Sequence, residues 1–347
     1  MTAPTVKVTM LGHSGSGKTT FTIGMLASMG PGEDDYAVST RDWDHGMELL
    51  DAWSRLLETG KFPKFTDMSE FKEYAFVLQR GLAETVVTVD WVDYRGGALN
   101  DRAAATDTAA LRARLEESDS VYIVLDGGIL GGWIDEIAAG TSKEATLASA
   151  RHRLGIAWTS NMLLTALDRM RSAGRRVPSL VVLVTKSDQL HEVLAKRGAD
   201  KKSAELSALN AVRRLLPFAF SGGACTLIDF VSVGRPGAPP QPSGFKPPFL
   251  FTFLRYLHDA VATEERVLQA ATAKHERTAG DLALLARRFG GGFFQSGKRD
   301  KLTALQQQLV AESSAHKARL EQLAAEAAKL EAELAGAHIF RNGDPGR

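Results

Sequence analysis

The sequence has little that would suit an extracellular or membrane-embedded protein. Only one of its 347 residues is cysteine, Cys225, which excludes an intrachain disulfide and a cysteine-based zinc site. No apolar run approaches the ~18 residues that a membrane-spanning helix needs. The N-terminus also lacks the charged and apolar regions of a secretory signal. We therefore expect a protein of the reducing cytoplasm.

Neither sign of charge is in excess. Lys and Arg number 42 and Asp and Glu number 41, which gives a formal net charge of +1. No overall field attracts nucleic acid or anionic lipid, so no nucleic-acid partner is predicted. Hydrophobic residues make up 44% of the chain, enough for a sizeable core in one large domain or two smaller ones.

Short β-rich runs alternate with long helical stretches along most of the chain. This alternation predicts an α/β fold, with a mostly parallel sheet covered by helices. The runs "SVYIVLD" and "SLVVLVT" are continuously apolar, as expected of strands buried on both faces. The predicted strands lie near residues 5–11, 73–80, 85–92, 120–126, 179–185 and 225–233.

A glycine-rich turn, "GHSGSGKT", follows the first predicted strand and precedes an apolar helix. It satisfies the phosphate-loop pattern G-x-x-x-x-G-K-[ST]. Such a loop points backbone N–H groups at phosphate oxygens, aided by the dipole of the following helix. The lysine would contact the β- and γ-phosphates and the threonine hydroxyl would ligate Mg²⁺. The predicted nucleotide-binding residues here are Gly12, His13, Ser14, Gly15, Ser16, Gly17, Lys18, Thr19 and Thr20.

The strand at 179–185 ends in a second motif, [NT]-K-x-D, made by Thr185, Lys186, Ser187 and Asp188. A carboxylate placed there in a phosphate-loop fold can accept hydrogen bonds from N1–H and the exocyclic amine of guanine. Adenine offers no such donor pair, so a buried carboxylate would be left unpaired. The stem of Lys186 can cover the base. We therefore predict a preference for guanine.

A third motif, D-x-x-G, lies between the other two, where Asp93 ends a predicted strand and Gly96 follows three residues later. In this motif the carboxylate holds Mg²⁺ through water and the glycine N–H senses the γ-phosphate. Asp90 lies on the same strand but has no glycine three residues later. We therefore assign the motif to Asp93.

In this order the three motifs resemble those of the translation-factor-related, Ras-like class of GTPases, over roughly residues 5–260. The resemblance implies a mostly parallel sheet with helices on both faces. It also implies binding of GTP or GDP with Mg²⁺ and hydrolysis of GTP to GDP and phosphate. A looser element of that class is a serine-containing turn after the last strand, whose backbone touches the guanine carbonyl. Ser232 and Val233 in "FVSVG" match its place.

The chain departs from a minimal GTPase in length. Lys18 and Asp93 are 93 − 18 = 75 positions apart, which predicts an insertion near 31–65 containing the helix "WDHGMELLDAWSRLLETG". A second insertion is expected near 127–160. The switch threonine that ligates Mg²⁺ is then Thr66, with Thr40 as the alternative. The G-x-x-P-x-x-T spacing that ends at Thr66 also resembles bacterial double-GTPase-type proteins.

The residue after the D-x-x-G glycine is usually a glutamine that orients the attacking water in Ras-like enzymes. Here it is Gly97, so we expect slow intrinsic hydrolysis. Arg95 is a candidate arginine finger in cis. With Lys18, Thr66 and Gly96 it completes the predicted catalytic set.

Beyond the predicted GTPase domain at 1–258, residues 259–337 read as two long helices joined at "GGGFFQSGK", followed by a flexible tail at 338–347. Leucine and alanine seams at three- and four-residue steps can close as a hairpin within one chain or as a coiled-coil dimer. Phe293 and Phe294 at the turn can contact a partner or a membrane surface.

Three functions fit these patterns. The first is a slowly hydrolysing GTP-binding switch that docks a protein partner through its switch regions or helical hairpin. The second is a self-assembling mechanochemical or scaffold GTPase that uses the hairpin. The third is an ATP-binding phosphate-loop protein, in which Asp188 would be incidental.

Overall fold

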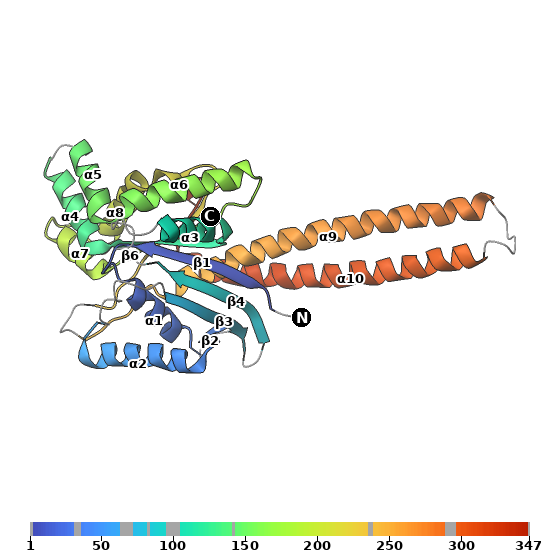
Figure 1. Ribbon diagram of the computed structural model, residues 1–347, viewed down its shortest axis with the longest axis horizontal. Coiled ribbons are helices and arrows are strands. Elements are labelled where there is room, and N and C mark those ends of the chain that lie inside the picture. The colour runs from blue at the N-terminus through green and yellow to red at the C-terminus, as the bar shows by residue number, and fades with distance from the viewer. Residues whose placement is uncertain are drawn as a thin grey trace. The chain divides into compact units, whose positions relative to one another are not determined.

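A computed structural model describes residues 3–30, 36–62, 72–81, 84–94, 105–140, 143–234, 239–288 and 296–345. The chain forms two compact units (Figure 1). One consists of residues 1–252 together with 336–347, and the other of residues 253–335. The last residues of the chain therefore return to the first unit.

The first unit is built on a sheet with the strand order β2-β3-β4-β1-β5-β6-β7-β8-β9. Strands β4, β1, β5, β6 and β7 are parallel, whereas β2 and β3 on one side and β8 and β9 on the other join by antiparallel pairing. The predicted α/β class is confirmed, with a parallel centre and antiparallel margins. The strands are β1 (Thr5–Gly12), β2 (Tyr36–Thr40), β3 (Lys72–Arg80), β4 (Glu84–Asp93), β5 (Ser120–Asp126), β6 (Ser179–Thr185), β7 (Cys225–Phe230), β8 (His338–Arg341) and β9 (Asp344–Pro345).

The two central strands β5 and β6 are buried along almost their whole length, as their continuous apolar sequence predicts. They run in register from Ser120 beside Ser179 to Asp126 beside Thr185. Parallel strands bring their carboxyl ends to one edge of a sheet. The residues that follow β1, β4, β5 and β6 therefore share that edge.

Helices cover both faces of this sheet (Figure 1). Side chains of α3, α4, α6, α7 and α8 pack on one face, against alternate residues such as Leu11, Ile123 and Val182. On the other face the Phe21 ring of α1 lies 6.0 Å from Tyr122 and 5.9 Å from Phe245. The helices are α1 (Lys18–Ser28), α2 (Trp43–Thr59), α3 (Ala105–Glu117), α4 (Gly127–Ala138), α5 (Lys143–Arg153), α6 (Ile156–Ser172), α7 (Ser187–Ala195), α8 (Lys201–Leu215), the 3₁₀ helix η2 (Pro217–Phe220), α9 (Lys246–Arg288) and α10 (Ser296–Glu333).

The last described residues differ from the prediction of a flexible tail. A flexible tail is expected over 338–347, but residues 338–341 form β8, which pairs with β7, and Asp344 and Pro345 form β9. The two strands are joined by Asn342 and Gly343, whose φ angles of 55° and 86° are those of a type I′ hairpin turn. Burial of the Phe340 ring holds β8 on the sheet.

The second unit is a pair of long helices, the continuation of α9 and the length of α10, which lie side by side (Figure 1). His258 on α9 and Glu331 on α10 form an ion pair of 3.1 Å. Farther along, buried Glu264 contacts His316. This contact supplies a partner for the polar His316 side chain, which lies in α10 among the leucine and alanine seams. In this chain the two helices form the intramolecular hairpin, one of the two predicted arrangements.

Candidate functional site

The phosphate-loop motif lies between β1 and α1, at the carboxyl edge of the parallel strands. The loop curls because Gly15 and Gly17 adopt φ angles of 77° and 90°, a region that side chains with a Cβ rarely enter. The Ser16 N–H donates to the His13 carbonyl at 3.1 Å, which closes a turn. The helix that follows begins at Lys18, so its positive end opens onto the loop.

Lys18 bends back over this loop. Its Nζ donates hydrogen bonds to the carbonyl oxygens of Gly12 at 3.0 Å and His13 at 3.2 Å. Burial lowers the pKa of the Lys18 ammonium, while the nearby Asp93 carboxylate acts in the opposite direction. An ammonium held in this way is a point charge that an entering anion can recruit.

Asp93 ends β4 beside Met10 of β1 and is buried. Its Oδ1 atom has no hydrogen-bond partner among the described residues. Burial raises the pKa of Asp93 to about 6, although the positive charges of Lys18 and Lys72 oppose that shift. A buried carboxylate oxygen without a partner, facing a lysine, is suited to a cation with oxygen-rich coordination.

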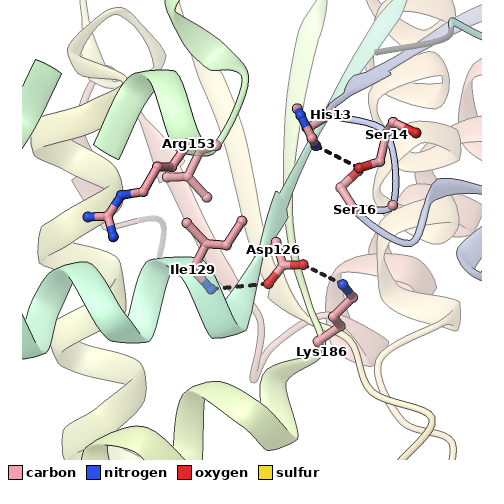
Figure 2. A pocket seen from close by; sticks show the side chains of 9 residues that line it. His13, Ser14, Ser16, Asp126, Ile129, Arg153 and Lys186 are labelled. Carbon is pink, nitrogen blue, oxygen red and sulfur yellow. Dashed lines mark hydrogen bonds and ion pairs between the residues drawn. The ribbon is translucent and has the colours of Figure 1, made fainter. Parts of the chain in front are cut away.

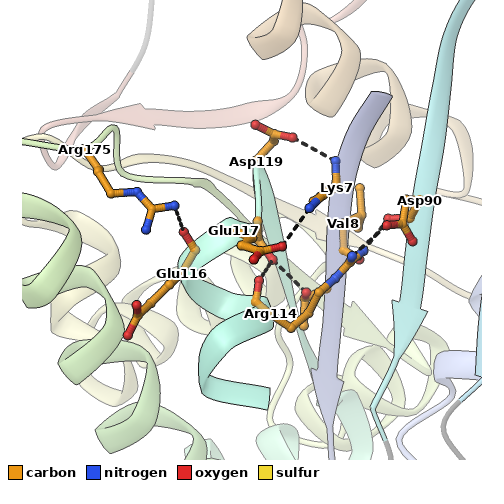
Figure 3. A network of polar contacts seen from close by, with 10 residues as sticks. Lys7, Val8, Asp90, Arg114, Glu116, Glu117, Asp119 and Arg175 are labelled. Carbon is orange, nitrogen blue, oxygen red and sulfur yellow. Dashed lines mark hydrogen bonds and ion pairs between the residues drawn. The ribbon is translucent and has the colours of Figure 1, made fainter. Parts of the chain in front are cut away.

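Asp90, the other aspartate considered on this strand, lies in a different environment (Figure 3). Its carboxylate accepts a hydrogen bond of 2.7 Å from Arg114 of α3, which also bonds the Asp90 carbonyl. Nearby, Lys7 of β1 pairs with Glu117 at 2.7 Å. These contacts fasten α3 to the sheet, so Asp90 has a structural partner where Asp93 has none.

Thr185, at the end of β6, contacts the phosphate loop directly. Its hydroxyl Oγ1 lies 2.5 Å from the Ser16 carbonyl oxygen and 3.0 Å from the Leu125 carbonyl of β5. The nearest approach of a Cβ built at Gly17 is also to Thr185, at 3.4 Å. The first residue of the T-K-S-D motif thus holds the phosphate loop against the ends of two strands.

Lys186 follows with a left-handed backbone, at a φ of 49°. Its ammonium is paired with the Asp126 carboxylate (Figure 2). Asp126 also accepts hydrogen bonds from the N–H groups of Gly128 at 2.9 Å and Ile129 at 3.1 Å, and so caps α4. The lysine stem is therefore fixed by the end of the neighbouring strand.

Asp188 meets the serine-containing turn of Ser232 and Val233. The Ser232 hydroxyl donates to Asp188 Oδ1 at 2.9 Å, and the Gly234 N–H donates to Ser232 Oγ at 3.0 Å. The other carboxylate oxygen, Asp188 Oδ2, is buried without a hydrogen-bond partner in the described chain. Val233 is buried beside this turn.

A cavity of about 420 Å³ opens beside the phosphate loop (Figure 2). Its polar lining comes from the loop, the Asp126–Lys186 pair and Arg153. Arg153 is held by two hydrogen bonds to the Glu136 carboxylate, of 2.8 and 2.7 Å. The cavity walls are His13, Ser14, Gly15, Ser16, Asp126, Ile129, Arg153, Leu154 and Lys186.

The structure therefore brings together residues from the first and last motifs, which are about 170 positions apart in the sequence. Thr66, Arg95 and Gly96 lie outside the described residues. Thr40, the alternative switch threonine, ends β2, and its hydroxyl donates to the Asp42 carbonyl at 2.7 Å. That hydroxyl contributes to the start of α2.

Two features of the site were not predicted from the sequence. Asp126 is one, although an aspartate between an apolar strand and two glycines is a recognisable helix cap. The other is Gly155, where a Cβ would lie 2.9 Å from the His13 Cβ. The predicted second insertion thus contacts the phosphate loop, which no local pattern indicates.

Within the described part of the chain, no three His, Cys, Asp or Glu side chains are grouped to hold a metal ion. A Mg²⁺ that is shared with phosphate oxygens does not need such a group, because the nucleotide supplies ligands. The residues present fit this kind of site, since Thr19 lies in the first turn of α1 and the buried Asp93 Oδ1 has no hydrogen-bond partner among the described residues. None of the helices that the structure describes is both long and apolar enough to cross a membrane.

No protein-family model and no curated protein matches the chain. Among solved structures, the GTPase-like domain of Ski7 from S. cerevisiae, bound to GDP and inorganic phosphate, is 14% identical, with a TM-score of 0.34. That match covers 66% of this chain and 43% of the other, so the chain spans less than half of the Ski7 structure's length.

Two further solved structures are similar at the same level. The small COPII coat GTPase SAR1 from Encephalitozoon cuniculi, in complex with GDP, is 11% identical over 69% of this chain and 76% of that one, with a TM-score of 0.29. The conserved domain of the dynein light intermediate chain is 13% identical over 69% and 70%, with a TM-score of 0.32. Likeness this distant carries no weight for function, which has to come from the site itself.

Proposed function

We propose that the chain is a GTP-binding protein of the Ras-like class that hydrolyses GTP slowly and acts as a nucleotide-dependent switch for a protein partner. The observation that carries this proposal is the contact between the Thr185 hydroxyl and the Ser16 carbonyl. It joins a loop shaped for phosphate to a motif suited to guanine. One nucleotide can therefore reach both.

Guanine is favoured over adenine by the state of Asp188. One of its oxygens accepts the Ser232 hydroxyl and the other is buried without a described partner. Guanine presents two donors to such a carboxylate, whereas adenine would leave it desolvated and unpaired. The same geometry argues against an ATP-binding protein.

Thr19 and Asp93 would hold Mg²⁺, and Thr66 is proposed as the third protein contact because the Thr40 hydroxyl is bonded at the start of α2. The ion, when bound, would neutralise charge between the β- and γ-phosphates. Lys18 would leave the Gly12 and His13 carbonyls for the phosphates. The loop N–H groups from Ser14 onward would complete the cradle.

Slow hydrolysis is proposed because Gly97 has no side chain that could orient water. Gly96 would sense the γ-phosphate, and Arg95 is retained as the candidate for charge compensation. Nucleotide exchange between GDP and GTP would then change the segments around Thr66 and Gly96. A more specific assignment, to the double-GTPase-type proteins, rests on the G-x-x-P-x-x-T spacing alone.

The test is competition for a fluorescent GTP analogue by unlabelled GTP and ATP, followed by single-turnover hydrolysis of bound GTP. We expect GTP to compete at least about a hundredfold better than ATP, which is about 2.7 kcal/mol of discrimination. Equal competition by ATP would overturn the guanine assignment. Rapid hydrolysis by the isolated chain would overturn the slow switch.

A further inference from the structure

Helix α2 carries a second apolar stripe next to the one that it buries. Leu49, Trp53 and Leu56 face the core and are at most 8% exposed. Trp43, Met47, Leu50 and Leu57 repeat at steps of three, four and seven residues, and so lie along one line of the helix. Their exposed fractions are 77%, 50%, 39% and 37%. We call these four residues the α2 stripe.

An acidic row follows the α2 stripe. Each of the four residues of the α2 stripe is followed directly by an acidic residue. The carboxylates therefore repeat at the same spacing, one position later in the sequence. The four carboxylates are exposed, and Arg55 pairs with one of them, Asp51, at 2.7 Å. One border of the stripe is therefore the core and the other is negatively charged. The acidic row consists of Asp44, Glu48, Asp51 and Glu58.

The stripe begins close to the phosphate-loop site. His45 in the first turn of α2 stacks on Tyr74 of β3 with ring centroids 5.2 Å apart. Burial, with a further contribution from the Asp93 carboxylate, raises the pKa of Tyr74. Tyr74 lies beside Trp91, two residues before Asp93 on β4, so a protein that docks on the first turn of α2 would lie close to this end of β4.

We propose that the α2 stripe and its acidic row bind a basic amphipathic helix of another protein. The stripe runs about 21 Å at 1.5 Å per residue, which suits another helix laid along it. Lysine or arginine on that helix would meet the acidic row. A second copy docked antiparallel on the same face would bring acidic row against acidic row, and an anionic lipid surface would be repelled.

This inference names the partner's chemistry for the switch proposed above. Only its nucleotide dependence rests on that function. The docking itself depends on the surface of α2 and is measured without reference to GTP. The docking proposal and the proposed switch function can therefore be overturned independently of each other.

The experiment uses the full chain and a displayed library of helical peptides. Each peptide has a fixed leucine stripe and flanking positions drawn from Lys, Gln or Glu. We expect lysine-flanked peptides to be enriched, and a selected peptide to lose at least about tenfold in affinity for the double variant Met47→Asp, Leu50→Asp. Leu206→Asp on α8 is the matched control, because Leu206 is 59% exposed on another surface. It should bind like the parent chain.

A charge reversal separates recognition from simple stickiness. Glu48→Lys with Glu58→Lys should weaken the lysine-flanked peptide and strengthen a glutamate-flanked one. No enrichment, or enrichment without regard to charge, would overturn the proposal. So would a dimer by light scattering that Leu50→Asp dissolves, or binding of the chain to phosphatidylserine vesicles through the stripe. Circular dichroism confirms that each variant is folded, and fluorescent GDP reports nucleotide binding independently.

Discussion

Lys18 and Asp93 form the charged centre of the site, and each is buried at a cost to its charged form. Burial lowers the pKa of the lysine and raises that of the aspartate. Their mutual attraction opposes both shifts, and Lys72 also opposes the shift of Asp93. A site kept in this condition without ligand is ready for an anion next to Lys18 and a cation next to Asp93. The binding of both would relieve the unfavourable burial.

Asp93→Asn should stabilise the ligand-free protein. The folded-state pKa of about 6 lies above the ordinary 3.8, so stability from this group is present below pH 3.8 and is lost as pH rises through 6. At pH 7 the loss is about 3 kcal/mol, at 1.36 kcal/mol per pH unit. Denaturant unfolding at pH 7 should show the variant as more stable, with the difference shrinking toward pH 4. A less stable variant at pH 7 would contradict the burial argument.

Lys18→Ala should weaken GTP binding by at least about a hundredfold, because the ammonium is the only side-chain charge inside the described loop turn. Isothermal titration calorimetry measures the change. Lys7→Ala is the control, since Lys7 pairs with Glu117 and not with the loop. If the Lys18 variant kept its full affinity, the phosphate-loop assignment would be wrong.

Asp188→Ala should remove the preference for the exocyclic amine of guanine. The parent chain should bind GTP about tenfold more tightly than inosine triphosphate, which lacks that amine, a difference of about 1.4 kcal/mol. The variant should bind both equally and more weakly. Competition assays with the two nucleotides give both ratios. A preference that survives the substitution would remove Asp188 from base recognition.

At the scale of elements, the six predicted strands and the helix of the first insertion are all present, because each has a long enough periodic or apolar run. Strand β2 was missed because five residues, Tyr36–Thr40, carry little signal without their antiparallel partner β3. Strands β8 and β9 were missed although Asn342-Gly343 is a strong hairpin signal. Composition suggested a tail, and pairing with β7 overrode it.

In the candidate site, too, some contacts could be predicted from the sequence and others could not. Motif residues next to strand ends were predictable, since β1 and β6 fix where their following loops lie. The contacts from Asp126 and Gly155 were not, because they depend on how α4 to α6 pack and not on local spacing. Thr66, Arg95 and Gly96, which lie outside the described residues, stay predictions.

Gly343→Ala tests the C-terminal hairpin. A Cβ there would lie 2.4 Å from the Phe220 carbonyl oxygen, at a φ of 86°. Gly174→Ala is the matched control, with a φ of 63° and nothing within 4 Å. The control should cost about 1 kcal/mol from backbone strain alone, and Gly343→Ala roughly 2 to 3 kcal/mol. Urea unfolding compares them, and equal losses would mean that the chain relieves the contact without leaving β7.

At the scale of the whole molecule, the helical hairpin bears on the choice between a switch and a self-assembling scaffold. The α9 and α10 pair is closed within one chain by His258–Glu331 and Glu264–His316 contacts. These two polar contacts are thus made without a second copy. This favours the switch.

Light scattering should accordingly report the same monomer mass with GDP and with a non-hydrolysable GTP analogue. Variant His316→Leu with Glu264→Leu, which makes the seam apolar, should be the one that promotes association. Growth of the parent chain with the GTP analogue would instead support the self-assembling GTPase.

The pairing of β7 with β8 also has a consequence for synthesis. All residues from Val231 to Ala337 are made after β7 and before its edge partner. A nascent or truncated chain that ends before His338 therefore leaves the strand CTLIDF as an open, largely apolar sheet edge, the kind of surface on which chains aggregate. Strand β8 covers this edge of β7, and the outer two-residue strand β9 contains Pro345, which offers no N–H to a further strand. The pairing of β8 with β7 is thus the step that removes this open edge.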